Sequence, residues 1–124
     1  MDIQTITVGN TVAAYSHATV ANGLIFTSGC TPHDPDTGKI RGKGIAEQTR
    51  LSIELLQDIL HQAGSNLHHV LQVQVFLDDI ERDYDAFNDV YMGMFPAPYP
   101  PRATVGAKLP GYTIEMVVRA AVIG

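Results

Sequence analysis

Charge is scarce in this chain of 124 residues, because Asp, Glu, Lys and Arg make up only 17% of it. An average globular protein carries about a quarter of such residues. Hydrophobic residues make up 45%, so the composition excludes an intrinsically disordered chain. The length predicts a single domain over residues 1–124. So few charges on a small domain suggest that part of its surface is covered, most simply by copies of itself.

Positive charge is the scarcer sign: eight Lys and Arg residues stand against thirteen Asp and Glu, for a formal net charge of −5. Nucleic-acid binding draws most of its non-specific affinity from basic side chains that neutralise phosphates. The one basic cluster, Lys39, Arg41 and Lys43, is too small for that purpose. We therefore do not expect a nucleic acid as partner.

Cysteine and long apolar runs are also nearly absent. Cys30 is the only cysteine, which excludes an internal disulfide and fits a reducing compartment. The segment Met1–Gln4 lacks the charged and apolar regions of a signal peptide. No apolar stretch approaches the ~20 residues of a membrane span. We expect a soluble, cytoplasmic protein without membrane contact.

Hydrophobic periodicity predicts five strands and two helices around a loop at Thr31–Gly44 that is rich in proline and glycine. This order is typical of an α+β fold with one mostly antiparallel sheet and both helices packed on one face. The expected strands are Gln4–Val8, Val20–Thr27, Val70–Leu77, Arg102–Lys108 and Thr113–Val122, and the expected helices are Ile45–Ala63 and Asp83–Phe95.

The last expected strand is apolar on both faces, because Met116 and Val118 point one way whereas Val117 and Ala121 point the other. Two helices on one face leave the second face open, and the chain has no further element to cover it. A homo-oligomer would cover it. The alternative is a monomer with modest apolar exposure.

Arg102 and Glu115 are the candidates for chemistry. Arg102 opens a strand after Pro100–Pro101, where a guanidinium could bind a carboxylate; the alternative is a surface or salt-bridged arginine. Glu115 lies within an apolar strand, where a carboxylate could move a proton or orient water; the alternative is a solvent-facing side chain.

A tight turn at Pro110–Gly111 would pair the last two strands, with Gly106 opposite Glu115 and Arg102 opposite Arg119. Because Arg102 would stand roughly 13 Å along the strand from Gly106, the two side chains must lean together or the register must shift. This pairing predicts one shared face for Arg102, Thr104, Gly106, Glu115 and Val117.

Other chemistries find less support. His68 and His69 point to opposite sides of a strand, and His33 and His61 lack partners at metal-ligand spacing, so we expect no metal. Cys30 is either a nucleophile or, as we prefer, a small buried thiol.

Motifs along nearly the whole chain carry a family resemblance. In order, they are Tyr15-Ser16-His17-Ala18, Phe26-Thr27-Ser28-Gly29, Asp34-Pro35-Asp36-Thr37-Gly38, Glu47-Gln48-Thr49-Arg50, Ala63-Gly64-Ser65, Val75-Phe76-Leu77-Asp78-Asp79, Phe87-Asn88-Asp89-Val90-Tyr91, Pro101-Arg102-Ala103-Thr104-Val105 and Ile114-Glu115. Their order and spacing resemble the RidA/YjgF family of reactive-intermediate deaminases, formerly described as translation inhibitors or endoribonucleases.

The resemblance implies a chorismate-mutase-like fold and a homotrimer with clefts between subunits. It also implies a 2-iminobutanoate/2-iminopropanoate deaminase-like activity, which hydrolyses enamines and imines of 2-keto acids, such as 2-aminoacrylate, to the keto acid and ammonia without a cofactor. In that family's terms, Arg102 binds the substrate carboxylate and Glu115 orients water. The substrate-binding positions are Tyr15, Ser28, Gly29, Cys30 and Asn88.

The chain also departs from the family pattern, at Ala14, His17, Cys30 and Thr104 and in a shorter span between Arg102 and Glu115. These departures leave the substrate open. One alternative is a non-catalytic trimer that binds small keto-acid-like carboxylates. Another is an RNA-directed activity, which the acidic net charge disfavours.

Overall fold

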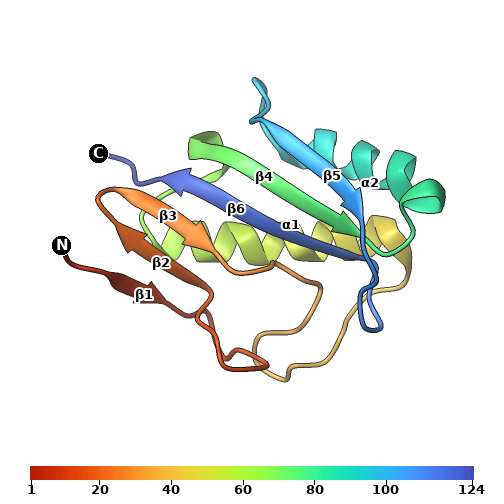
Figure 1. Cartoon of the computed structure of the whole chain (residues 1–124), viewed down its shortest axis with the longest axis horizontal. Coiled ribbons are helices and arrows are strands. Elements are labelled where there is room, and N and C mark those ends of the chain that lie inside the picture. The colour runs from red at the N-terminus through yellow and green to blue at the C-terminus, as the bar shows by residue number, and fades with distance from the viewer.

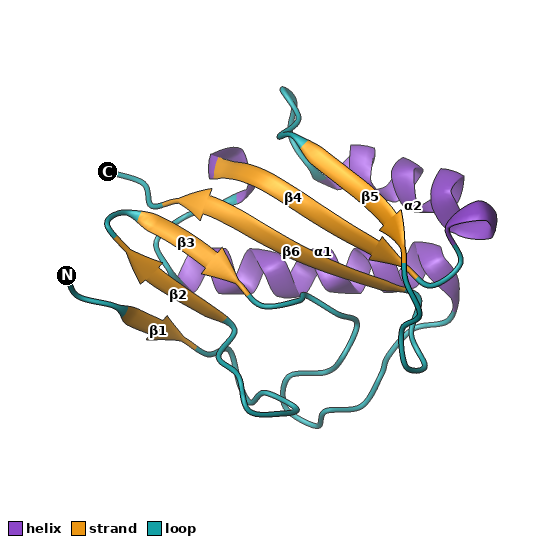
Figure 2. Cartoon of the chain, in the orientation of Figure 1, coloured by secondary structure: helices purple, strands orange, loops and turns teal.

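The computed structural model describes residues 1–124 as one six-stranded sheet with the strand order β1-β2-β3-β6-β4-β5. Two helices lie behind this sheet and leave its other face open (Figure 1). The α+β architecture expected from the sequence is therefore confirmed (Figure 2). The elements are β1 (Gln4–Ile6), β2 (Ala18–Ala21), β3 (Leu24–Thr27), α1 (Gly44–Gln62), a 3-10 turn (Leu67–His69), β4 (Val70–Leu77), α2 (Ile80–Met94), β5 (Arg102–Gly106) and β6 (Ile114–Ala121).

The segment expected as one strand, Val20–Thr27, contains the end of one strand and the whole of the next. Asn22 and Gly23 have φ values of 52° and 74° and join β2 to β3. Positive φ at both central residues is what a tight hairpin with right-handed strand twist requires, and Asn-Gly supplies it at low cost. The sequence interpretation recognised Asn22-Gly23 as a turn signal before Leu24 but assigned no separate strand before it, so it missed strand β2.

Helix α1 ends where the sequence places its stop signal. Gly64 has a φ of 81°, and its N–H donates to the carbonyl of His61. The next N–H, of Ser65, donates to the carbonyl of Leu60. This pair of hydrogen bonds closes the last turn of the helix and depends on a residue that adopts positive φ without strain.

The core lies between the helices and the alternating inward side chains of β4 and β6. Val73, Val75, Met116 and Val118 are essentially inaccessible to solvent and belong to a buried cluster of 22 residues. Each such side chain stabilises the fold by about 1.5–3 kcal/mol through its removal from water. Strands β4 and β6 therefore form the well-packed centre of the sheet, to which the loops are attached.

Strand β5 does not pair with β6, so the predicted hairpin is wrong. β4 lies between them and pairs in parallel with β5 and antiparallel with β6. Val73 is the partner of both Arg102 and Val118, whereas Phe76 is the partner of Glu115. Direct partners point to the same face and successive residues alternate, so Arg102 and Glu115 lie on opposite faces of the sheet.

The physical reason lies in the connection between β5 and β6. The Ala107 N–H donates to the carbonyl of Leu77, and the Leu109 N–H donates to Oδ1 of Asp78. These bonds carry the chain across the end of β4, so that β6 begins on the other side of that strand. The β4–α2–β5 segment is then an ordinary parallel crossover, which needs an intervening helix rather than a tight turn.

The open face of the sheet is apolar, as the sequence predicts. Leu24, Phe26, Leu71 and Val105 each expose between 41% and 49% of their surface. Glu115 shares this face, because its partner Phe76 also pairs with Val105. Neither helix has the length and apolar character needed to cross a membrane.

Candidate active site

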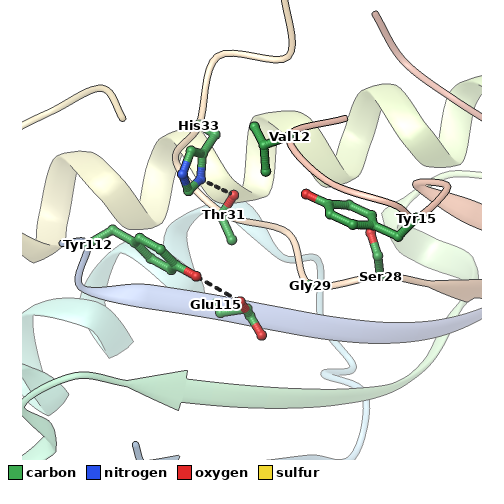
Figure 3. A pocket seen from close by; sticks show the side chains of 8 residues that line it. All are labelled: Val12, Tyr15, Ser28, Gly29, Thr31, His33, Tyr112 and Glu115. Atoms are coloured by element: carbon green, nitrogen blue, oxygen red, sulfur yellow. Dashed lines mark hydrogen bonds between the residues drawn. The ribbon is translucent and has the colours of Figure 1, made fainter. Parts of the chain in front are cut away.

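A cavity of about 310 Å³ surrounds the carboxylate of Glu115, and we call it the Glu115 cavity (Figure 3). Its walls come from the N-terminal loop before β2, the segment that follows β3, and the start of β6 with the turn before it. The lining residues are Val12, Tyr15, Ser28, Gly29, Thr31, His33, Tyr112 and Glu115.

Gly29 lies directly beneath the carboxylate. A Cβ atom at this position would stand 2.5 Å from Cδ and 2.7 Å from Oε2 of Glu115, which is closer than real side chains approach. Reciprocal backbone hydrogen bonds between Cys30 and Met116, of 2.6 and 3.0 Å, fix this approach. A glycine is therefore required here for close packing against Glu115, rather than for an unusual φ.

Tyr112 supplies the hydrogen bond to Glu115. Its hydroxyl donates to Oε1 of Glu115 at 3.2 Å. Burial and the neighbouring Glu115 charge raise the pKa of Tyr112 to about 12. The phenol therefore stays protonated at neutral pH and acts as a donor.

His33 packs edge-on against Tyr112, with ring centroids 5.0 Å apart. Its Nδ1 lies 2.7 Å from Oγ1 of Thr31. Burial lowers the pKa of His33, and the charge of Glu115 only partly opposes that shift. The imidazole is therefore neutral at neutral pH, and Glu115 is the only formal charge among the lining residues of its cavity.

His17, one of the departures from the family pattern, holds the N-terminal loop in place. It is 4% exposed, and its Nδ1 accepts a hydrogen bond of 2.9 Å from the Val8 N–H. Its carbonyl accepts hydrogen bonds from both the N–H and the hydroxyl of Ser28. Burial lowers the pKa of His17, so the ring is neutral. Its neighbour Tyr15, 41% exposed, forms a wall of the cavity.

Arg102 lies in a second cavity of about 340 Å³, which we call the Arg102 cavity. Its guanidinium carbon stands 4.6 Å from the ring centre of Tyr91, 5.0 Å from that of Phe87 and 5.9 Å from that of Tyr84. Nη2 donates to the Tyr84 hydroxyl at 3.0 Å. The lining residues are Asn88, Tyr91, Met92, Tyr99, Pro100 and Arg102.

No acidic side chain neutralises this arginine. The three salt bridges of the chain involve Arg50 and Arg82 only. The rings hold the guanidinium through cation–π attraction, which leaves donors free for an anion. Arg102 is therefore not a salt-bridged arginine.

The sequence-predicted site residues fall into three places. Tyr15, Ser28, Gly29 and Glu115 line the Glu115 cavity, and Asn88 and Arg102 line the Arg102 cavity. The side chain of Cys30 lines neither cavity.

Cys30 is fully buried within the core cluster. Burial, assisted by the Glu115 charge and opposed by a hydrogen bond with Thr27, raises the pKa of the thiol to about 12. The thiol is therefore a core side chain, as the buried-thiol interpretation predicts, and its expected contact with substrate finds no support in this geometry.

Sequence reasoning missed four lining residues of the Glu115 cavity: Val12, Thr31, His33 and Tyr112. The sequence could have indicated His33 as a lining residue, because it stands in the loop that directly follows Gly29. Tyr112 had none, because the turn before β6 was expected to form a tight hairpin. No group of three or more His, Cys, Asp or Glu side chains is arranged to hold a metal ion.

The sheet order, the two helices on one face and the carboxylate cavity define a YjgF-type α+β protein. A family model described as endoribonuclease L-PSP matches residues 6–122. The chain therefore belongs to this family, which is the RidA/YjgF family indicated by the sequence motifs.

Individual relatives agree with this membership. The mitochondrial protein mmf2 of Schizosaccharomyces pombe is 44% identical over 97 residues, which cover 77% of this chain and 75% of the relative. The chloroplastic Reactive Intermediate Deaminase A of Arabidopsis thaliana is 34% identical over 73% of this chain and 48% of its own length. The crystal structure of yeast Mmf1 superposes with a TM-score of 0.90 at 30% identity and covers 98% of this chain and all of that one.

Proposed function

We propose that this protein hydrolyses reactive enamines and imines of 2-keto acids, such as 2-aminoacrylate, to the keto acid and ammonia. The observation that carries the proposal is the Glu115 carboxylate, which is held by one donor and faces an open cavity. The name of the Arabidopsis relative, Reactive Intermediate Deaminase A, supports the same reaction class.

The charges of the two cavities suit the two ends of such a substrate. A 2-imino acid carries a carboxylate at one end and a basic nitrogen beside it. The uncompensated guanidinium of Arg102 would bind the carboxylate, and the carboxylate of Glu115 would attract the protonated imine and a water molecule.

Because the two side chains lie on opposite faces of one chain, we propose that a complete site forms between copies in a homotrimer. Arg102 lies on β5, at the edge of the sheet, where a neighbouring copy can reach it. Glu115 lies on the open apolar face, which a neighbouring copy would cover. Arg102 of one subunit would then complete the Glu115 cavity of the next.

The reaction follows from these positions. A proton from solvent adds to the enamine carbon and gives the electrophilic iminium ion. Glu115 takes a proton from water as the new C–O bond forms, and the C=N π electrons move to nitrogen. The Glu115 carboxyl group then protonates that nitrogen, the C–N bond breaks with its electron pair leaving on ammonia, and the hydroxyl proton returns to the Glu115 carboxylate. Holding water and substrate in this geometry supplies most of the advantage.

The test generates 2-aminoacrylate in situ and follows keto-acid formation with the purified protein. We expect a rate above the buffer control, and a loss of roughly 10²-fold or more for Glu115→Gln, which removes the base. Ser65→Ala is the matched control, since it removes a hydroxyl that bonds the Ala121 carbonyl at the other end of β6. A wild-type rate equal to the buffer control across several imino acids would overturn the proposal.

A second candidate function is a trimer that binds small keto-acid-like carboxylates without turning them over. The unpaired charge of Arg102 favours it, because carboxylate binding needs that charge whether or not hydrolysis follows. Calorimetric binding of 2-ketobutyrate that is lost in Arg102→Ala, together with absent deaminase activity, would favour this second function.

Two further expectations stay predictions. The family description names an endoribonuclease, but the net charge of −5 disfavours RNA, and a steep salt dependence of RNA affinity would revive that function. We also propose the cytoplasm as the compartment, although relatives carry mitochondrial and chloroplastic names. Localisation of a tagged full chain tests it.

A further inference from the structure

The two oxygens of the Glu115 carboxylate have different surroundings (Figure 3). Oε1 accepts the hydrogen bond from the Tyr112 hydroxyl. Oε2 lies over Gly29, where the missing Cβ leaves room for it. No other side chain or backbone group of the chain donates to this carboxylate, so Oε2 is the oxygen left for a water molecule.

We propose that Tyr112 is a positioning residue, which occupies Oε1 of Glu115 and thereby assigns Oε2 as the oxygen that holds the attacking water and takes its proton. This inference rests on the proposed hydrolysis at the Glu115 cavity and adds to it a residue outside the motifs of the family resemblance.

Tyr112 is itself held on both sides. On one side the His33 ring packs edge-on against it, and the contact between His33 and Thr31 orients that ring. On the other side, the N–H and hydroxyl of Thr113 both donate to Oε1 of Gln48 on α1, at 2.9 and 2.7 Å. The phenol therefore approaches the carboxylate from a fixed direction.

The loop that carries His33 is also closed. His33 and Ile40 form an isolated antiparallel bridge, and the Asp34 N–H donates to the Lys39 carbonyl. Backbone contacts therefore fix the loop that carries His33. Because the His33 ring packs against Tyr112, these contacts also help to fix the direction of the Tyr112 hydroxyl.

Of the titratable groups near the Glu115 carboxylate, only Tyr112 donates a hydrogen bond to it. They are Tyr112, His33 and Tyr15 in the cavity walls. The Cys30 thiol lies on the core side, close enough for the Glu115 charge to act on it. Burial keeps His33 neutral and keeps the Tyr112 phenol and the Cys30 thiol protonated at neutral pH. Of these groups, the phenol makes the hydrogen bond, so its removal leaves Oε1 without a partner.

Loss of this donor should change kcat and KM differently. A carboxylate with two free oxygens can rotate and hold water in unproductive positions, which lowers kcat by roughly 10- to 100-fold while KM changes little.

The experiment compares wild type, Tyr112→Phe, Glu115→Gln and Ser65→Ala, each as the full-length assembled protein, with an imine of 2-ketobutyrate generated in situ. Thermal unfolding first checks that each variant folds. We expect Tyr112→Phe to lose kcat at nearly unchanged KM and to bind 2-ketobutyrate as the wild type does. Ser65→Ala should match the wild type in all three measurements.

Three results would overturn the inference, and they can be told apart. If Tyr112→Phe matches Ser65→Ala in kcat and KM while Glu115→Gln is inactive, the proposed function stands and the positioning role falls. If Tyr112→Phe raises KM and weakens 2-ketobutyrate binding at unchanged kcat, Tyr112 contacts the substrate instead. An inactive wild type overturns both the proposed function and this inference.

Discussion

The two cavities hold their charged groups by different means. Backbone contacts position Glu115, because Gly29 lies beneath it and the Cys30–Met116 bridge keeps the two segments together. Side chains position Arg102, because aromatic rings of α2 surround its guanidinium. The close packing of Gly29 against Glu115 leaves no room for a larger side chain. The position of Arg102 depends instead on several separate contacts. The two cavities should therefore respond differently to mutation.

The cavities also share a feature, since neither contains the opposite charge. Glu115 has no cation beside it, and Arg102 has no carboxylate. Two uncompensated charges on opposite faces of one small sheet make sense if a ligand and a second copy bring them together. The proposal that the site is divided between two chains can therefore be tested most directly.

The largest expected effect comes from mixing two inactive variants. Arg102→Ala and Glu115→Gln should each lose roughly 10²-fold or more in kcat/KM. In the proposed trimer, a mixed assembly would bring Arg102 of one variant and Glu115 of the other together in a single intact cleft. Random mixing would restore about a quarter of the clefts in a cyclic trimer. Co-expression followed by the deaminase assay measures the recovery.

The outcomes of that mixing experiment are opposite for the two arrangements. If each chain carried a complete site, mixing would restore nothing, because every chain lacks one of the two groups. Recovery that also disappears when both substitutions are placed in the same chain would establish a site shared between subunits.

Gly29→Ala comes next. Its new Cβ would collide with Cδ of Glu115, so the carboxylate must move by a large part of an ångström. Such a misplacement costs up to ~10²-fold in kcat. Because the guanidinium of Arg102 that binds the carboxylate is untouched, the affinity for 2-ketobutyrate should fall much less than kcat does. Calorimetry and kinetics on the same preparation separate the two effects, and equal losses in both would contradict the comparison.

Tyr84→Phe should have a smaller effect on the other cavity. It removes the hydrogen bond between Arg102 and the Tyr84 hydroxyl but keeps the ring and its cation–π contact. One hydrogen bond to a charged group is worth about 1.5 kcal/mol or more, yet water can replace it at this exposed position. We expect 2-ketobutyrate affinity to fall by about 3- to 10-fold with little change in kcat. A loss as large as that of Arg102→Ala would mean that the Tyr84 hydroxyl, rather than the aromatic rings, positions the guanidinium.

Local signals explain how much of this molecule the sequence predicts. The stop of α1 at Gly64 and the alternation of Val73 and Val75 in β4 depend on nearby residues, and both were predicted correctly. Burial of the Cys30 thiol also followed from residue type. The Asn22-Gly23 turn was visible as well, although strand β2 before it was not recognised.

The pairing of β5 could not be predicted in the same way. Whether Arg102–Gly106 pairs with β4 or with β6 depends on the path of the loop after it, which the Asp78 carboxylate directs from 31 residues away. The same holds for Tyr112, whose contact with Glu115 needs the actual loop path. Contacts between distant segments therefore set the site, whereas local patterns set the elements.

The smallest expected effect is that of Cys30→Ala, which tests the border between cavity and core. Cys30 follows Gly29 directly, yet its thiol is buried among core residues, and its pKa of about 12 keeps it protonated. We expect activity within twofold of the wild type and a stability loss of about 1 kcal/mol from the small void. Thiol alkylation of the folded wild type at neutral pH should be slow, because only the thiolate reacts. Rapid alkylation that abolishes activity would instead place the thiol in the Glu115 cavity.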